Sequence, residues 1–285
     1  ETVWEVIIVR TLYLDCFSGI SGNMFVGMML QNDISLEGLK ETFSRLPVSG
    51  YSLICEPVVK QGIQAQYYDV VLDGERAEHE HCCPDEHEYR REHHHEHVHE
   101  HPHAHGHHHH VHVHRGLREI KEIIEKADLS AAVKAKSCAV FETLAIAEGK
   151  VHGLPPEEVH FHEVGAVDCI LDIVGAVWAL EESGIEQIGV SPLHTGSGFI
   201  QCAHGLMPVP APATAEILTG LPFYSTAIDG ELVTPTGAAL VKTLAAYAGP
   251  RPEDFVHERI VYGAGTKDLE IPNVLRGYIG EYKMF

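Results

Sequence analysis

A histidine-rich stretch from His79 to His114 limits what the rest of this chain can fold into. It holds 17 of the 23 histidines within 36 residues, mixed with Glu, Pro, Ala and Gly. Large apolar side chains are nearly absent from it, so burial cannot offset the entropy that ordering the stretch would cost. We therefore expect residues 73–115 to form a disordered, solvated, metal-binding insertion between two folded parts.

The two flanking segments carry the spacing of helices and strands. Residues 11–72 predict a strand at Thr11–Asp15, helices at Asn23–Gln31 and Leu36–Leu46, and strands at Tyr51–Val59 and Gln64–Leu72. Residues 116–285 predict short strands from Gln187 onward and helices at Leu117–Lys126, Ala131–Lys150, Ile170–Glu182, Thr214–Leu218 and Gly237–Tyr247. This mixture indicates an α/β or α+β fold, a layered sheet-and-helix domain in which both flanking segments pack into one unit.

Charge and cysteine usage restrict the partners and the compartment. With 41 acidic and 20 basic side chains the net charge is −21, which disfavours nucleic acid and anionic membranes and favours cationic partners. No apolar run reaches the roughly 18 residues of a membrane-spanning helix. The seven cysteines follow no regular spacing, which argues against a disulfide framework and favours a reducing cytoplasm.

The clustered histidines are candidate metal ligands. Neutral imidazole suits nickel, copper and zinc, and many imidazoles on a flexible chain allow several of them to wrap one ion. A solvated spacer and a switch whose imidazoles gain charge near pH ~6.5 stay open as alternatives. The affinity order alone favours copper over nickel and zinc. The candidate ligands are His93, His94, His95, His97, His99, His101, His103, His105, His107, His108, His109, His110, His112 and His114.

A second group of candidate residues surrounds the start of a strongly apolar helix. His160 and His162 point the same way on an extended segment, and Glu163 follows directly. Asp168 and Asp172 lie four apart on one helix face, where Asp168 can serve as N-cap and Asp172 sits among apolar neighbours that make a carboxylate costly. All five are candidate catalytic residues of an ordered metal or acid/base site. A structural cap and a hydrogen-bonded core histidine are the competing explanations.

Small-residue loops supply candidate cofactor-binding residues. The loop after Asp15 joins a strand to a helix, a shape that binds anions, although it lacks the Gly-Lys-Ser/Thr of a P-loop. The sequence from Thr234 to Gly237 opens another helix, where hydroxyls and free N–H groups can hold a phosphate. Ordinary turn geometry competes with binding at each loop. The candidates are Asp15, Ser18, Gly19, Ser21, Gly22, Gly196, Ser197, His204, Thr234 and Thr236.

These stretches together resemble LarC, the nickel insertion protein of nickel-pincer cofactor biosynthesis. The motifs occur in the family's order over nearly the whole chain from Thr11. They are LYLDCFSGISGNMF (12–25), the histidine-rich insertion, VHGLPPEEVHFHEVGAVDCILDIVGA (151–176), SPLHTGSGFIQCAHGLMPVPAPATAEIL (191–218), GELVTPTGAAL (230–240), YGAGTKD (262–268) and PNVLR (272–276).

The resemblance implies a specific reaction. LarC-like proteins are lyases that insert nickel into pyridinium-3,5-bisthiocarboxylic acid mononucleotide, giving a pincer in which two sulfurs and one ring carbon hold the metal. The reaction in the family uses CTP with Mn(2+) or Mg(2+), and the product serves lactate racemase and related enzymes. A ring C–H must lose its proton, and His162 or Glu163 is a candidate base for that step.

The chain departs from the family pattern in two respects. The family commonly has Asp where this chain has Asn23, and Ser where it has Cys169, which weakens a ligand or capping role at both positions. The family also carries a further C-terminal domain associated with CTP, so we expect this chain to be a fragment or one of two separately made parts. A non-enzymatic nickel store or chaperone, and a metal-dependent hydrolase built on the second group of residues, stay open as alternatives.

Overall fold

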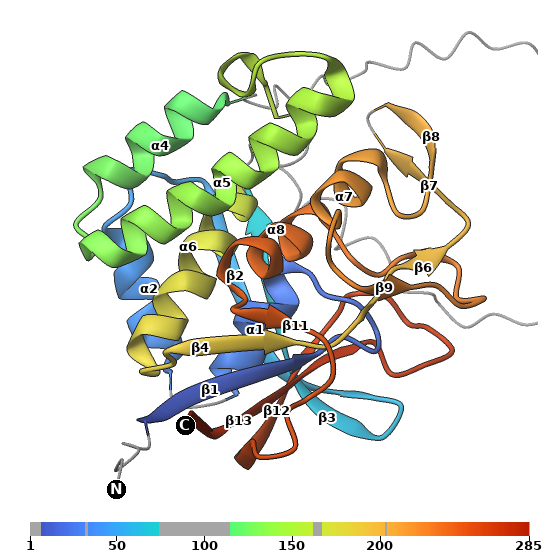
Figure 1. Ribbon diagram of the computed structural model, residues 1–285. Coiled ribbons are helices and arrows are strands. Elements are labelled where there is room, and N and C mark those ends of the chain that lie inside the picture. Colours follow the sequence, from blue (N-terminus) through green and yellow to red (C-terminus); the bar gives the residue numbers. More distant parts are fainter. Residues whose placement is uncertain (1–6, 32–33, 74–114, 162–166, 203, 285) are drawn as a thin grey trace, which may run out of the picture.

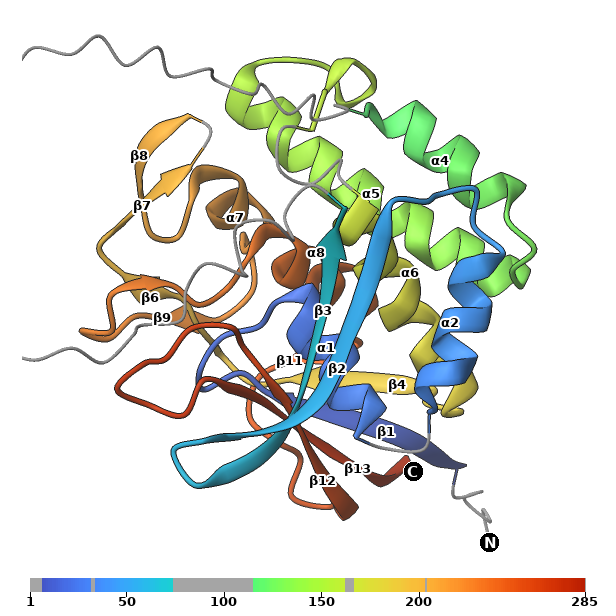
Figure 2. The same ribbon diagram turned by 180° about the vertical axis from the view of Figure 1, so that it is seen from behind.

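The computed structural model describes residues 7–31, 34–73, 115–161, 167–202 and 204–284. A seven-stranded mixed sheet in the order β11-β4-β1-β13-β12-β3-β2 forms one layer, and helices cover one of its faces (Figures 1 and 2). The strands are β1 (Ile7–Asp15), β2 (Tyr51–Lys60), β3 (Ile63–Leu72), β4 (Gln187–Val190), β11 (Tyr247–Ala248), β12 (Val256–Ala264) and β13 (Val274–Met284).

The sheet joins segments from both sides of the histidine-rich stretch. Strand β1 pairs parallel with β4 and antiparallel with β13, and β3 pairs parallel with β12 and antiparallel with β2. The hairpin of β2 and β3 turns at Gln61 and Gly62, which both have positive φ. Because β12 and β13 lie between β1 and β3, the N-terminal segment encloses strands from the C-terminal segment.

The helical layer and several small strands complete the described chain. The helices are α1 (Gly22–Leu30), α2 (Leu36–Ser44), α4 (Leu117–Lys126), α5 (Ala131–His152), α6 (Val167–Glu182), α7 (Pro212–Ile217), α8 (Pro235–Leu244) and the 3-10 turn η1 (Pro156–Glu158). The small strands are β5 (Leu193–His194), β6 (Gly196–Ser197), β7 (Phe199–Cys202), β8 (Gly205–Pro208), β9 (Phe223–Tyr224) and β10 (Gly230–Glu231).

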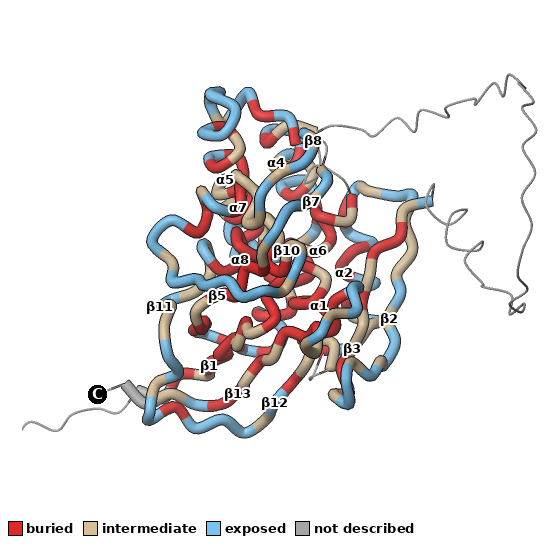
Figure 3. Tube along the Cα trace, turned by 90° about the vertical axis from the view of Figure 1, so that its right-hand side faces the viewer, coloured by how far each residue is buried: buried red, intermediate tan, exposed pale blue. Residues whose placement is uncertain are grey.

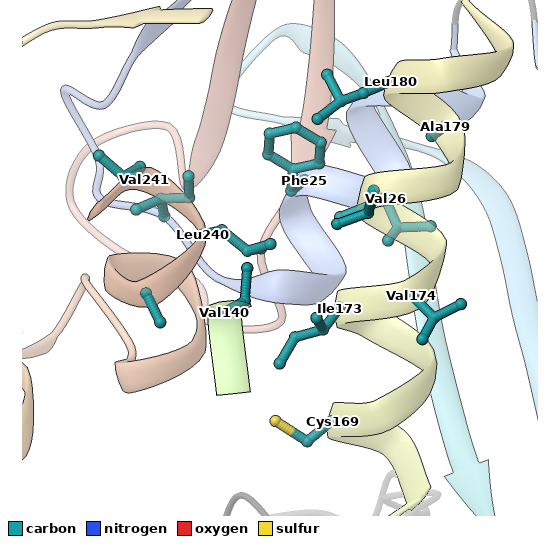
Figure 4. Packing of buried hydrophobic residues seen from close by; sticks show 14 of the residues in the cluster. Phe25, Val26, Val140, Cys169, Ile173, Val174, Ala179, Leu180, Leu240 and Val241 are labelled. Atoms are coloured by element: carbon teal, nitrogen blue, oxygen red, sulfur yellow. The ribbon is translucent and has the colours of Figure 1, made fainter. Parts of the chain in front are cut away.

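Helix α6 lies at the centre of the hydrophobic core. Its buried side chains meet those of α1, α5 and α8, as Figure 4 shows for Phe25, Val140, Ile173 and Leu240. Buried positions gather in the helices and on the facing side of the sheet, while loops and the outer edges are exposed (Figure 3). Each fully buried Phe, Leu or Ile contributes roughly 1.5–3 kcal/mol, so the burial of α6 fixes where its N-terminal turn lies.

Glycines bring α1 unusually close to the sheet. A Cβ on Gly263 of β12 would lie 1.9 Å from the Met24 carbonyl oxygen, and a Cβ on Gly27 would lie 2.7 Å from the Gln66 carbonyl oxygen of β3. Neither contact is possible for a larger residue without displacement. The two glycines therefore seat α1 directly on β3 and β12.

The expected mixed, layered fold is confirmed, with corrections at two helices. The predicted helix Gly237–Tyr247 ends at Leu244, because Ala246 N–H bonds the Ile188 carbonyl and Tyr247 enters β11 beside β4. Helix α6 starts at Val167, so Asp168 lies in its first turn and is not its N-cap. Of the proposed insertion at 73–115, residues 74–114 lie outside the described part of the chain. Among the described helices, none is long and apolar enough to cross a membrane.

Candidate functional site

The N-terminal ends of α1, α6 and α8 meet at a pocket of about 330 Å³. Residues 21–23 at the start of α1, Asp168 and Asp172 of α6, and residues 234–236 at the start of α8 line it. Asp69 of β3 and Glu231 of β10 also line it. Four carboxylates and three helix N-termini therefore face one small space, where N–H groups and positive helix ends favour negative charge.

Backbone hydrogen bonds hold the starts of α1 and α8 together. Ile20 N–H donates to the Leu232 carbonyl at 2.9 Å, and Thr234 N–H donates to the Ile20 carbonyl at 3.1 Å. Gly19 has φ +78°, and a Cβ there would lie 1.9 Å from the Leu232 oxygen. A Cβ on Gly237 would likewise lie 2.2 Å from the Ile20 oxygen. The loop that precedes α1 thus depends on glycine at both contacts.

The hydroxyls of Ser21 and Thr234 cap their helices. Ser21 Oγ accepts from Met24 N–H at 3.4 Å, and Thr234 Oγ1 accepts from Gly237 N–H at 3.1 Å. Ser21 Oγ also donates to Asn23 Oδ1 at 2.5 Å. Each hydroxyl already satisfies one N–H of its helix, so the remaining N–H groups of the first turns are the donors that a ligand can use.

The carboxyl group of Asp172 has a perturbed pKa. Its Oδ1 is buried and has no hydrogen-bond partner among the described residues. Burial, followed by the negative charges of Asp168 and Asp69, raises the pKa of Asp172 well above its usual value. A Cβ on Gly22 would lie 2.6 Å from Asp172 Oδ2, so the start of α1 closes directly over this carboxyl. Asp172 therefore takes up a proton at higher pH in the folded protein than in the unfolded chain.

Cys169, which also lines the pocket, links α6 to α8. Its Sγ lies 2.9 Å from Thr236 Oγ1. Burial, and then the charge of Asp168, raises the pKa of the Cys169 thiol well above its usual value. A neutral, buried thiol is a poor nucleophile and a poor metal ligand, so Cys169 acts as a structural contact between the two helices.

Sequence reasoning identified Asp168, Asp172, Ser21, Gly22, Thr234 and Thr236 in separate motifs, and the structure brings them to this one pocket. It missed Asp69 and Glu231. Asp69 sits in a predicted strand and accepts a hydrogen bond from Tyr67 at 3.0 Å. A charged residue within an otherwise uncharged strand was the available signal for Asp69. Glu231 lies three residues before Thr234, within the GELVTPTG motif.

Asp15, Ser18 and Gly19 lie beside the pocket and do not line it. Arg276 donates two hydrogen bonds to Asp15 Oδ2, at 2.5 and 3.1 Å, and its guanidinium lies over the Phe17 ring. Ser18 is buried, and Gly19 makes the turn described above. This loop positions α1, while the ion pair joins β1 to β13.

His160 lies in a different hollow from Asp168 and Asp172. It lines an open groove of about 1040 Å³ between α4, α5 and η1, together with carboxylates that include Glu119, Glu142 and Glu157. A β-bridge joins His160 to Gly116, next to the residue where the described chain resumes after the histidine-rich stretch. The groove is therefore acidic and adjoins that point.

Three other predicted residues are spread over the β5–β10 region. Gly196 pairs with Glu231, and Ser197 donates to the Ile228 carbonyl at 3.0 Å, so both hold the strand beside the pocket wall. His204, in the turn between β7 and β8, lies near His152 at the end of α5. None of the three lines the pocket.

The remaining predicted residues lie outside the described part of the chain. These are His162, Glu163 and all the proposed metal ligands from His93 to His114. Within the described ranges, no three His, Cys, Asp or Glu side chains are arranged to hold a metal ion.

Comparison with known proteins gives a consistent result. The sequence matches the family described as "Nickel insertion protein" over residues 12–284. It is similar to proteins named "Pyridinium-3,5-bisthiocarboxylic acid mononucleotide nickel insertion protein" from Desulfitobacterium hafniense (42% identity), Geobacillus kaustophilus (44%) and Thermotoga petrophila (47%). Each match covers 95% of this chain and 58%, 60% and 61% of those relatives. No solved structure matches.

The chain therefore spans about three fifths of the length of these curated relatives. The match to the family covers nearly all of this chain, because it begins in β1 and ends in β13. It includes every residue of the pocket at the starts of α1, α6 and α8. On this evidence the chain belongs to the nickel insertion protein family.

Proposed function

We propose that this chain binds nickel and takes part in its insertion into pyridinium-3,5-bisthiocarboxylic acid mononucleotide, the compound in its relatives' names. The single observation that carries the site assignment is the pocket at the starts of α1, α6 and α8, lined by the partly buried Asp172, whose Oδ1 is buried. Nickel is cargo in this reaction, so the site must hold the organic precursor and move a proton.

The charges of the pocket complement the precursor. The precursor contains a pyridinium cation, two thiocarboxylate groups and a phosphate. Four carboxylates suit the pyridinium cation, while the N–H groups at the starts of α1 and α8 suit the thiocarboxylate or phosphate oxygens. A volume of about 330 Å³ is enough for the ring and its substituents, at the lower end of ligand pockets.

Among the described residues, Asp172 is the candidate base for removing the ring proton. Insertion exchanges a ring C–H bond for a carbon–nickel bond and releases one proton. A carboxyl whose pKa is raised by burial accepts a proton near neutral pH better than an ordinary carboxylate. His162 and Glu163, just before α6 in the sequence, are alternative bases.

The histidines from His79 to His114 supply the nickel. Dense imidazoles form exchangeable sites for a borderline cation. The negative charge of the groove beside His160 attracts the released ion, and this groove adjoins the point where the histidine-rich stretch ends. Titration calorimetry tests the capture step. Because imidazole must be unprotonated to bind, the nickel stoichiometry should fall steeply from pH ~7.5 to ~5.5; pH-independent loading argues against histidine ligation.

The finer features of the family complete the proposal. We place the chain in the cytoplasm as the N-terminal part of a lyase that uses CTP with Mn(2+) or Mg(2+), in which residues 11–72 and 116–285 form one folded unit. The CTP-associated part is the C-terminal domain, and the product serves an enzyme such as lactate racemase. Storage or delivery of nickel without insertion is the competing function.

One assay separates insertion from storage. The chain is incubated with nickel, CTP, Mn(2+) and the precursor, with and without the C-terminal domain supplied separately, and the absorbance of the pincer product is followed. Asp172→Asn should lower the rate by about 10²–10⁴-fold, the usual contribution of a general base, while nickel loading stays intact. The exposed Asp128→Asn variant is the matched control. Full activity of Asp172→Asn excludes Asp172 as the base, and absence of product under every condition supports storage.

A further inference from the structure

Two histidines that lie far apart in the sequence meet at the end of α5. The ring centres of His152, in the last turn of α5, and His204, in the turn between β7 and β8, are 4.9 Å apart with planes inclined at 49°. Figure 1 shows the β7–β8 hairpin beside the end of α5. This pair lies outside both the pocket and the acidic groove described above.

The separation fits two imidazoles bound to one ion. A borderline metal lies about 2.1 Å from an imidazole nitrogen, which places it about 3.2 Å from the ring centre. Two such ligands at an angle of about 90–110° put their ring centres about 4.5–5.2 Å apart. The observed 4.9 Å falls within this interval, and the inclined planes exclude a parallel stack.

Glu148 provides the support that metal-bound histidines usually have. It lies one turn before His152 on α5, and its Oε2 is 3.3 Å from His152 Nε2. A carboxylate this close to one ring nitrogen can orient the ring and leave the other nitrogen, here Nδ1, to bind an ion. Nearby Lys150 is paired with Glu216, so its charge is balanced.

We infer that His152 and His204 form a two-histidine site for a borderline divalent cation such as Ni(II), with Glu148 orienting His152 and water filling the remaining positions. Two protein ligands hold an ion more weakly than the three or four of closed sites, which suits a transfer point on the folded body. This site does not depend on the proposed insertion reaction, and it requires no histidine from 79–114.

Histidine footprinting of the whole chain tests the site without interference from the other imidazoles. Diethyl pyrocarbonate modifies imidazole nitrogens that carry no metal, and peptide mass spectrometry measures the rate at each histidine separately. Ni(II) should slow modification of His152 and His204 together by tenfold or more. It should leave His257 unchanged, because that ring is exposed and packs against Tyr278 in another part of the fold.

Variants establish that the two histidines act as a pair. His204→Asn should abolish the nickel protection of His152, and His152→Asn should abolish that of His204. Glu148→Gln should raise the Ni(II) concentration for half-protection about tenfold, as loss of an orienting carboxylate does. Unchanged circular dichroism confirms that each variant folds. Protection of His152 that persists in His204→Asn, or no protection of either at saturating Ni(II), overturns the inference and leaves the pair as a packing contact.

Discussion

Replacing Asp172 with Asn should change how the stability of the folded protein depends on pH. The carboxyl has an ordinary pKa near 3.8 in the unfolded chain, and burial together with Asp168 and Asp69 raises it well above that value in the folded protein. Between these two pKa values the folded state holds one proton more than the unfolded state. Stability of the native protein therefore falls as pH rises through this window.

The size of the effect follows from that one proton. Each pH unit within the window costs the native protein about 1.4 kcal/mol relative to Asp172→Asn, which has no proton to lose. The variant should be close to the parent below pH ~4 and should become more stable than it as pH rises. The difference should stop growing once the pH passes the folded pKa of Asp172.

Urea unfolding at half-unit steps from pH 4 to 8 measures this difference. Trp178 on α6 packs against Gly38 of α2 and serves as a fluorescent reporter of the core. Asp128→Asn removes an exposed carboxylate and corrects for the change in net charge. A stability difference between Asp172→Asn and the parent that is constant over the whole range refutes a raised pKa, and with it the case for Asp172 as a proton acceptor.

Three further predictions concern contacts that build the site. Gly22→Ala should cost about 1–3 kcal/mol of unfolding free energy, because the new Cβ overlaps the side chain of Asp172. Thermal denaturation measures this cost, and an unchanged midpoint contradicts the close contact. Arg276→Lys should cost about 1 kcal/mol, since an ammonium cannot reproduce the two hydrogen bonds to Asp15; urea unfolding decides, and equal stability shows that charge alone suffices. The unfolding free energy of Cys169→Ser should stay within about 1 kcal/mol of the parent's, because the serine hydroxyl keeps the hydrogen bond to Thr236. Cys169→Ala loses this bond and should be less stable than Cys169→Ser. The opposite order in urea unfolding argues against a structural role for the bond.

The spacing of apolar residues along the chain predicted much of the secondary structure. The apolar positions of Leu117–Lys126 predicted α4 at its observed bounds, and the pair of strands around Gln61 and Gly62 became β2 and β3. These elements depend on neighbours along the chain, so their pattern is visible in the sequence. The end of α8 was misplaced because pairing of Tyr247 with β4 overrides its helical spacing.

The candidate site was only partly visible. Asp172 stood out as a carboxylate in an apolar helix, and the Thr-Pro-Thr-Gly run marked the start of α8. Nothing local connects either of them to Asp69 or to Ser21. Those residues meet because α1 is seated on β3 through Gly27, and because Ile20 bonds to Leu232 and Thr234.

The sequence by itself determined the family, the kinds of element and the residues with unusual chemistry, since each is written in spacing or in side-chain type. The tertiary structure alone decided which of them share a pocket, and it separated His160 from the carboxylates of α6. The physical reason is that long-range pairing depends on close backbone contacts and burial between distant segments. A pKa such as that of Asp172 is raised only when those contacts remove its carboxyl from water.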